Sequence, residues 1–298
     1  MNMTKFFKKS RILLFFSLMF FYTYAVSANA LINIVTAENF YGEVAKEIGS
    51  PYVNVISILN NPNQDPHLFT TSPSTAKALS TADIVVYNGA DYDPWMQTIL
   101  SDQKIRHIIV VAELMKIKTG NNPHIWYMPE TMPTYAKTLV ENLNQIDPKH
   151  REYFQAQLKQ FNQSYQAIFK KLKFLKQHFN NIPVIATEPV FNYMSDAIGL
   201  KMHGKGFQLS IMNDVPPTFS EVKQFEDDLH QHSVKVFIFN KQVVNPSTER
   251  MLSIAKSENI PVVGINETMP INLTYVQWIF QELDQLKHAL DNGLEQSS

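Results

Sequence analysis

Residues 147–179 read DPKHREYFQAQLKQFNQSYQAIFKKLKFLKQHF. Apolar side chains recur in this stretch at alternating spacings of four and three, which is the period of one face of an α-helix. Asp147 can cap such a helix and Pro148 suits its first position. From Pro148 to Phe179 the helix would extend about 48 Å, at ~1.5 Å per residue. A helix of that length exceeds one ordinary lobe, so we expect it to run along two.

The apolar stripe of this helix has two possible partners. It can pack on both lobes and tie them together, or it can form a coiled coil with a second chain. The residues that make up the stripe are Phe154, Leu158, Phe161, Tyr165, Ile168, Leu172, Leu175 and Phe179.

The chain on either side of this helix alternates short apolar runs with helical segments. Four runs precede the helix, at 32–37, 52–59, 82–89 and 106–112, and three follow it, at 182–187, 234–240 and 260–265. Nearly continuous apolar strands separated by helices indicate parallel strands covered on both faces. We therefore predict an α/β fold with two doubly wound lobes, each a largely parallel sheet with flanking helices. The lobes would span residues 31–146 and 181–298, bridged by the long helix at 147–180.

Residues 1–30 have the layout of a secretory signal peptide. Four cations precede the apolar run ILLFFSLMFFYTYAV, and SANA follows it with small residues at the positions that a signal peptidase reads. The alternative is an uncleaved membrane anchor. No cysteine occurs in the chain, which excludes disulfides and thiolate metal ligands. On these grounds we expect an exported periplasmic protein with a cleaved signal peptide and no lipid anchor.

The charge of the exported chain argues against nucleic acid as a partner. Without the four cations of the signal segment, 22 Lys and Arg face 27 Asp and Glu, a formal charge of about −5. Binding to a phosphate backbone needs the opposite sign.

Two histidines lie in matching loops. His67 stands in DPHLF and His124 in NPHIW, each with a polar residue and proline before it and an aliphatic and an aromatic residue after it. Each ring could simply be hydrogen-bonded within its own loop. Two matched loops in one lobe instead favour a metal site, because neutral imidazole is the commonest metal ligand.

Carboxylates that could complete such a site follow two strands of the second half. Glu188 comes directly after IPVIAT, and Glu267 comes after IPVVGI with Asn266 before it. In open α/β sheets, ligands bind where the strand ends meet their loops. We therefore expect a metal site formed by the two imidazoles of His67 and His124 with carboxylates from these two strand ends.

With these motifs in order along the chain, the sequence resembles the periplasmic metal-binding proteins of zinc/manganese ABC transporters, the group often called cluster A-I. The DPHLFTTSPS loop, the NPHIW loop, the long helix and the Glu188 strand end carry the resemblance, which covers most of residues 31–290. It implies two α/β lobes bridged by a helix, with one metal ion held between them by two ligands from each lobe. His67, His124 and Glu188 match the first three ligand positions of the family.

The fourth position of the family departs from its pattern in this chain. The residue that aligns with the family's aspartate is Asn266, and the neighbouring Glu267 would have to supply the carboxylate. The resemblance implies one Zn²⁺ or Mn²⁺ per chain as transported ligand, a membrane permease as partner, and a monomer without enzymatic activity. Glutamate at position 188 and the absence of a histidine-rich loop favour manganese, whereas raw affinity favours zinc.

Two rival functions remain open at this point. A metal-dependent periplasmic hydrolase would need a general base and an open coordination position, and the chain has no H-E-x-x-H, G-x-S-x-G or phosphate-loop motif. A metal-stabilised adhesion protein is the other rival.

Overall fold

The computed structural model describes residues 30–62, 69–101 and 103–295. The predicted signal peptide therefore lies outside the described residues, apart from Ala30. From Leu31 onward the chain forms one compact unit, and this unit contains two lobes.

Each lobe is built on a parallel four-stranded sheet, and the strand order is the same in both. The first sheet has the order β2-β1-β3-β4 and the second β6-β5-β7-β8. The strands are β1 (Ile32–Glu38), β2 (Val53–Leu59), β3 (Ile84–Tyr87), β4 (His107–Val110), β5 (Pro183–Ala186), β6 (Lys201–His203), β7 (Val236–Asn240) and β8 (Val262–Ile265). The predicted doubly wound α/β architecture is confirmed.

One strand has no counterpart in the apolar pattern. The edge strand β6 has only three residues, of which Lys201 is exposed and Met202 and His203 are half-buried. Edge strands meet solvent on one side, so they need no continuous apolar run. The other seven strands coincide with the predicted runs, and only β1 extends one residue beyond its run, to Glu38.

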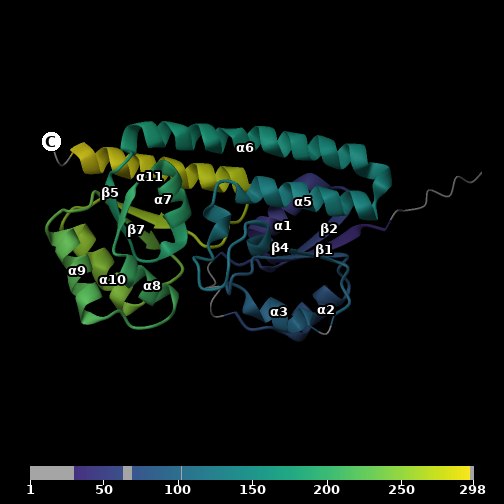
Figure 1. Ribbon diagram of the computed structural model, residues 1–298, viewed down its shortest axis with the longest axis horizontal. Helices are drawn as coiled ribbons and strands as arrows, with labels where there is room; N and C mark the ends of the chain where they lie inside the picture. Colours follow the sequence, from purple (N-terminus) through teal and green to yellow (C-terminus); the bar gives the residue numbers. More distant parts are fainter. Residues whose placement is uncertain (1–29, 63–68, 102, 296–298) are drawn as a thin grey trace, which may run out of the picture. The chain divides into compact units, whose positions relative to one another are not determined.

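Helices cover both faces of each sheet (Figure 1). They are α1 (Asn39–Gly49), α2 (Pro73–Ser80), α3 (Pro94–Leu100), α4 (Val111–Leu114), α5 (Thr131–Ile146), α6 (Arg151–Phe179), α7 (Asn192–Ile198), α8 (Lys205–Met212), α9 (Phe219–His230), α10 (Pro246–Ser257) and α11 (Tyr275–Glu295). Three-residue 3-10 turns stand at Ile125–Tyr127, Pro148–His150 and Pro189–Phe191.

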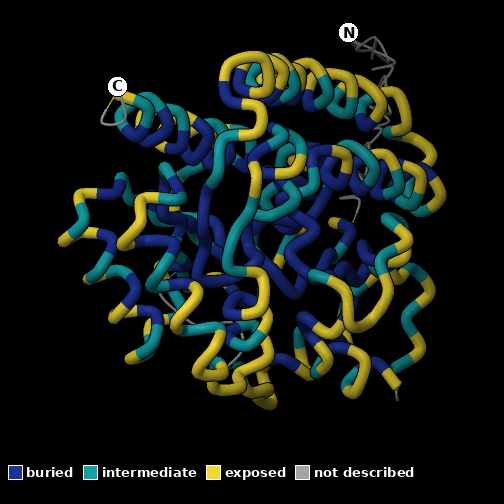
Figure 2. Tube along the Cα trace, turned by 60° about the vertical axis from the view of Figure 1, so that its left-hand side comes forward, coloured by how far each residue is buried: buried dark blue, intermediate teal, exposed yellow. Residues whose placement is uncertain are grey.

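The long helix α6 runs along both lobes, as its length predicts (Figure 1). It packs on α1 and α5 in the first lobe and on α7 and α11 in the second. Seven of its apolar side chains are buried against these helices: Phe154, Phe161, Tyr165, Ile168, Leu172, Leu175 and Phe179. Figure 2 shows the inner side of the helix buried and the outer side exposed. The stripe is thus covered within a single chain, and a coiled coil is not needed to bury it.

The start of α6 differs from the predicted cap. Asp147 makes no capping bond, and its carboxylate instead meets Nδ1 of His150 at 2.5 Å. The backbone N–H of Asp147 still donates to Leu143 O and ends α5. Because one residue closes α5 just before α6 begins, the connection tightens into the 3-10 turn at Pro148–His150.

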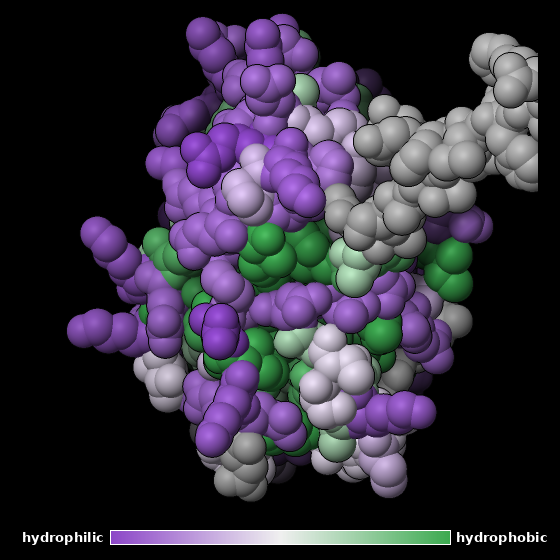
Figure 3. Space-filling view, turned by 90° about the vertical axis from the view of Figure 1, so that its right-hand side faces the viewer, coloured by the Kyte–Doolittle hydropathy of each residue, from purple (hydrophilic) through white to green (hydrophobic). Residues whose placement is uncertain are grey.

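In the part of the chain that the structure describes, the exposed large apolar side chains are scattered along the sequence, from Leu31 to Ile271. The face in Figure 3 is largely hydrophilic, with apolar patches separated by hydrophilic residues. Among the described residues, no helix combines the length and the apolar character that a membrane span requires.

Candidate metal centre

The candidate metal centre lies at the carboxyl ends of the strands of the second lobe. Glu188 follows β5, Asn240 is the last residue of β7, and Glu267 follows β8. The strand order changes direction between β5 and β7, which is the point where parallel α/β sheets bind ligands. All three side chains are buried.

The two predicted carboxylates meet on one amide group. Nδ2 of Asn240 donates to Glu188 Oε2 at 2.6 Å and to Glu267 Oε1 at 2.7 Å. Because both bonds end on the same nitrogen, these two carboxylate oxygens lie at most about 5.3 Å apart. Glu188 and Glu267 are thus held side by side, although 78 residues separate them in the sequence.

His124 comes to this pair from the first lobe. Its ring is fully buried, and Nε2 lies 3.4 Å from Glu267 Oε1. Nδ1 donates to Oδ1 of Asn122 at 2.6 Å, and the amide of Asn122 is itself oriented by a bond from Nδ2 to Pro189 O at 2.8 Å. This bond fixes the proton on Nδ1, so the lone pair of Nε2 points towards the carboxylates. Metal-binding histidines are commonly oriented through their second nitrogen in this way.

Tyr92 adds a second polar group from the first lobe. Its hydroxyl donates to Glu267 Oε2 at 3.3 Å. Burial, together with the negative charges of Glu267 and Glu38, raises the pKa of Tyr92 well above its ordinary value. The hydroxyl therefore stays protonated and acts as a donor to the carboxylate.

His67 lies outside the described residues, so the structure does not place it. Among the residues that are described, no group of three or more histidine, aspartate or glutamate side chains stands arranged to hold a metal ion. What the structure brings together is one imidazole and two carboxylates. The chemistry of this donor set suits a divalent transition metal.

Asn266 points away from this group. Its backbone N–H donates to Glu282 Oε1 at 3.0 Å, and its carbonyl accepts from the Tyr127 hydroxyl at 2.5 Å. Glu282 also accepts from Trp278 Nε1 at 2.9 Å. Burial raises the pKa of Glu282 to about 7, and its hydrogen bonds, with Tyr127 first, oppose that rise. Asn266 therefore belongs to a neighbouring polar cluster around Glu282.

A buried pair of carboxyl groups, Glu38 and Asp93, is connected through Asn88 to the loop that carries His124. Asp93 accepts from the backbone N–H groups of Asn88 at 2.7 Å and Gly89 at 2.8 Å. Glu38 faces Asp93, and burial raises the pKa of Glu38 well above its ordinary value. Asn88 Nδ2 in turn donates to Pro123 O at 2.9 Å, next to His124. Since backbone donors stabilise the Asp93 anion, the proton shared by the pair belongs on Glu38.

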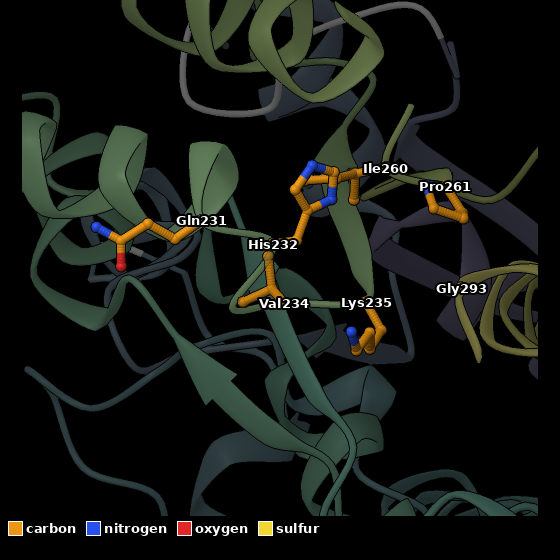
Figure 4. Close-up of a pocket in the computed structure, with 7 residues that line it drawn as sticks. All are labelled: Gln231, His232, Val234, Lys235, Ile260, Pro261 and Gly293. Carbon is orange, nitrogen blue, oxygen red and sulfur yellow. The ribbon is translucent and has the colours of Figure 1, made fainter. Parts of the chain in front are cut away.

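A hollow of about 340 Å³ lies at the other end of the second sheet (Figure 4). Its lining comes from the segments before β7 and β8 and from α11: Gln231, His232, Val234, Lys235, Ile260, Pro261 and Gly293. These residues include no carboxylate. The hollow is therefore separate from the candidate metal centre.

Three residues of the site have no role in the sequence prediction. Asn240 ends the apolar strand β7 and Tyr92 lies in the loop between β3 and α3. Neither stands in a motif, and only the fold brings them to the carboxylates. Asn122 does have a signal, since it precedes proline in the loop that carries His124.

The two-lobed α/β fold, with a buried polar cluster where the lobes meet, is the architecture expected of the class of binding proteins for metal ions. A family model confirms this class and makes it specific. The chain belongs to the family of the periplasmic zinc-uptake complex component A (ZnuA), whose model matches residues 34–289. The predicted resemblance to periplasmic metal-binding proteins of zinc/manganese ABC transporters is confirmed.

Curated relatives share about a quarter of their residues with this chain. The metal ABC transporter substrate-binding lipoprotein ScbA of Streptococcus cristatus is 24% identical over 256 residues, 79% of each chain. The manganese ABC transporter substrate-binding lipoprotein PsaA of Streptococcus pneumoniae is 24% identical over 260 residues, 80% of this chain and 81% of its own.

Solved structures share the fold. The periplasmic zinc-binding protein TroA of Treponema pallidum superposes with a TM-score of 0.74 at 18% identity, covering 87% of this chain and 99% of its own. The manganese-bound periplasmic metal-binding protein from Candidatus Liberibacter asiaticus gives a TM-score of 0.72 at 14% identity, with the same coverage of both chains.

One predicted feature of localisation is wrong. We expected a protein without a lipid anchor, but ScbA and PsaA are both named lipoproteins. The expectation rested only on the absence of cysteine from this chain. Export from the cell agrees with the relatives.

Proposed function

We propose that this protein captures one divalent transition metal ion, Zn²⁺ or Mn²⁺, between its lobes and delivers it to the membrane permease of an ABC transporter. The observation that carries the proposal is the meeting of His124 from the first lobe with Glu188 and Glu267 from the second. Because the chain belongs to the zinc-uptake family, we interpret this contact between the lobes as a metal site.

We assign four ligands to the ion: His67, His124, Glu188 and Glu267. His124 would bind through Nε2, because Nδ1 is engaged with Asn122. Two carboxylates would cancel the charge of a divalent ion, which lowers the cost of burying it. Two neutral imidazoles and two carboxylates suit either metal, and no thiolate competes for softer ions.

The protein acts as a monomeric carrier without catalytic activity in this proposal. A hydrolase would hold its metal as a resident cofactor with an exchangeable water and a general base beside it. In the adhesion alternative, the metal would serve only to stabilise the fold. The relatives are named substrate-binding proteins, and no observation on this chain favours either rival.

Removal of both histidines tests the proposal. We expect the double variant His67→Ala, His124→Ala to lose binding of Zn²⁺ and Mn²⁺ in titration calorimetry while its thermal unfolding stays cooperative. The matched control is His230→Ala with His232→Ala, which removes two histidines that pair with Glu258 on the surface. Unchanged affinity in the first variant, or equal loss in the control, would refute the assignment.

A further inference from the structure

Asn122 bonds a residue of its own lobe and a residue of the opposite lobe through one amide group. Its Oδ1 accepts from Nδ1 of His124 at 2.6 Å and from the backbone N–H of His124 at 3.1 Å. Its Nδ2 donates at 2.8 Å to the carbonyl of Pro189 in the second lobe, which directly follows Glu188. The hydroxyl of Tyr193 in α7 also donates to Asn122 O, at 2.7 Å. The loop that carries His124 is therefore attached to the second lobe beside Glu188.

Gln242 forms the same kind of link from the second lobe to the first. Its Oε1 accepts from the backbone N–H of Glu267 and, at 3.3 Å, from that of Thr268, both in its own lobe. Its Nε2 donates to Pro62 O in the first lobe at 2.6 Å and also to Thr268 Oγ1. Glu267 and Thr268 are buried, so their backbone N–H groups would be costly to leave without this acceptor. The loop that carries Glu267 is therefore attached to the first lobe.

The two links are reciprocal. In each lobe, the amide oxygen accepts from a residue that is a proposed ligand, and the amide nitrogen donates to a proline carbonyl of the opposite lobe. A backbone N–H can only donate and a carbonyl can only accept, so neither amide can exchange its oxygen and nitrogen. An ion bound by His124 and Glu267 leaves only when both side chains release it. Either movement disturbs an amide that is also bonded to the opposite lobe.

We propose that Asn122 and Gln242 are positioning residues, each of which couples the contact between the lobes to the orientation of one ligand, and that together they slow the release of the bound ion. The inference rests on the proposed function, since it concerns release from the same site. Hydrogen bonds joined in one network strengthen one another, so the loss of a bond across the lobes weakens the hold on the ligand residue at the other end of the amide.

The test is the rate at which Zn²⁺ leaves Asn122→Asp and Gln242→Glu, measured by stopped-flow mixing of the loaded protein with excess chelator. Each variant keeps an oxygen that accepts from its own lobe and loses the donor to the opposite lobe. We expect each variant to release Zn²⁺ faster than the unchanged chain by about tenfold or more, a typical effect of residues that orient metal ligands. The added carboxylate by itself would attract the cation and slow its release, so faster release would come from the lost link.

Asn39→Asp is the matched control. The Nδ2 of Asn39 donates to Met269 O and its Oδ1 accepts from the N–H of Met269, so this variant also loses a donor across the lobes, but at a residue that bonds no proposed ligand. We expect its release rate to stay close to that of the unchanged chain. Thermal unfolding without metal checks that the variants are folded. Where an acidic variant does not fold, Asn122→Ala or Gln242→Ala replaces it, with the same faster release expected.

Failure of either link variant to release Zn²⁺ faster than the unchanged chain would overturn the inference. Equally fast release from Asn39→Asp would also overturn it, because general loosening of the lobes would then be sufficient. If the unchanged chain binds only Mn²⁺, the same comparison is made with that ion. Failure of the unchanged chain to bind either ion would instead refute the proposed function.

Discussion

Asn266 and Glu267 are neighbours in the chain, yet their side chains serve different polar clusters. The backbone N–H of Asn266 points to Glu282, whereas that of Glu267 points to Gln242. This turn of the backbone directs the Glu267 carboxylate to Asn240 and His124. An additional methylene, compared with aspartate, lets a glutamate one position later reach these two side chains.

Substitution of Asn266 and Glu267, one at a time, tests which of the two residues binds the metal ion. We expect Glu267→Gln to weaken Zn²⁺ binding by about a hundredfold or more, because it removes the charge of a proposed ligand. Asn266→Ala should cost less than about tenfold, since its bonds to Glu282 and Tyr127 come mainly from its backbone. Titration calorimetry measures both. A larger loss in Asn266→Ala would make position 266 the ligand position and the present assignment wrong.

At the residue scale, sequence motifs predict the candidate metal ligands but not the residues that orient them by hydrogen bonds. His124, Glu188 and Glu267 stand beside prolines or strand ends, and the structure brings them together. Asn240 ends an apolar strand without any motif, and its role depends on contacts across 52 and 27 residues. Contacts of that kind follow from the tertiary fold, which local pattern does not encode. The position of His67 stays a prediction.

Among the elements, α1 and α11 meet across the two lobes at a half-buried acid, Glu43. Glu43 of α1 accepts from the backbone N–H of Tyr275, the first residue of α11, at 2.9 Å. Burial raises the pKa of Glu43 to about 7, and the negative charge of Glu47 adds to this rise. The hydrogen bond from Tyr275 and the positive charge of Lys46 oppose it. The folded protein therefore holds a proton here that the unfolded chain releases near its ordinary pKa of 4.5.

This pKa shift predicts how stability depends on pH. The contribution of Glu43 is fully present below about pH 4.5 and is lost as pH rises through about 7, at most about 3 kcal/mol. Glu43→Gln cannot ionise, so we expect the metal-free variant to lose less stability than the unchanged chain between pH 5 and pH 7.5. Urea unfolding at both pH values measures the difference. Glu141→Gln serves as the control, because Glu141 is exposed. An equal change in the free energy of unfolding between the two pH values, in the unchanged chain and in Glu43→Gln, would contradict the pKa shift.

Patterns at the element scale predict most of this architecture. The 3.6-residue period of α6 and seven of the eight strands are readable from apolar spacing, because each contains a run or a stripe of apolar residues. The short edge strand β6 and the 3-10 turn before α6 are not readable in this way. The strand β6 forms because it pairs with β5, and the 3-10 turn forms because α5 ends directly before it.

For the whole molecule, the two lobes are joined by more than the long helix. The side chain of Asn39 bonds both the carbonyl and the N–H of Met269, at 2.7 and 3.1 Å. Gln242 bonds Pro62 O, and Asn122 bonds Pro189 O. Each bond links protein groups of opposite lobes outside the proposed ligand set. Opening the lobes as rigid bodies would break these bonds together and also disturb the packing of α6.

Metal binding should therefore change the arrangement of the lobes very little, with ion entry and exit depending on local loop movement. We expect small-angle X-ray scattering to give superimposable curves for the chelator-treated and the Zn²⁺-loaded protein. Asn39→Ala is the informative comparison, because it removes two interlobe bonds at once and contacts no proposed ligand. If those bonds limit opening, this variant should show a larger radius of gyration without metal and contract when Zn²⁺ is added. Contraction of the unchanged chain by the same amount would show hinge closure of the lobes and contradict the local route.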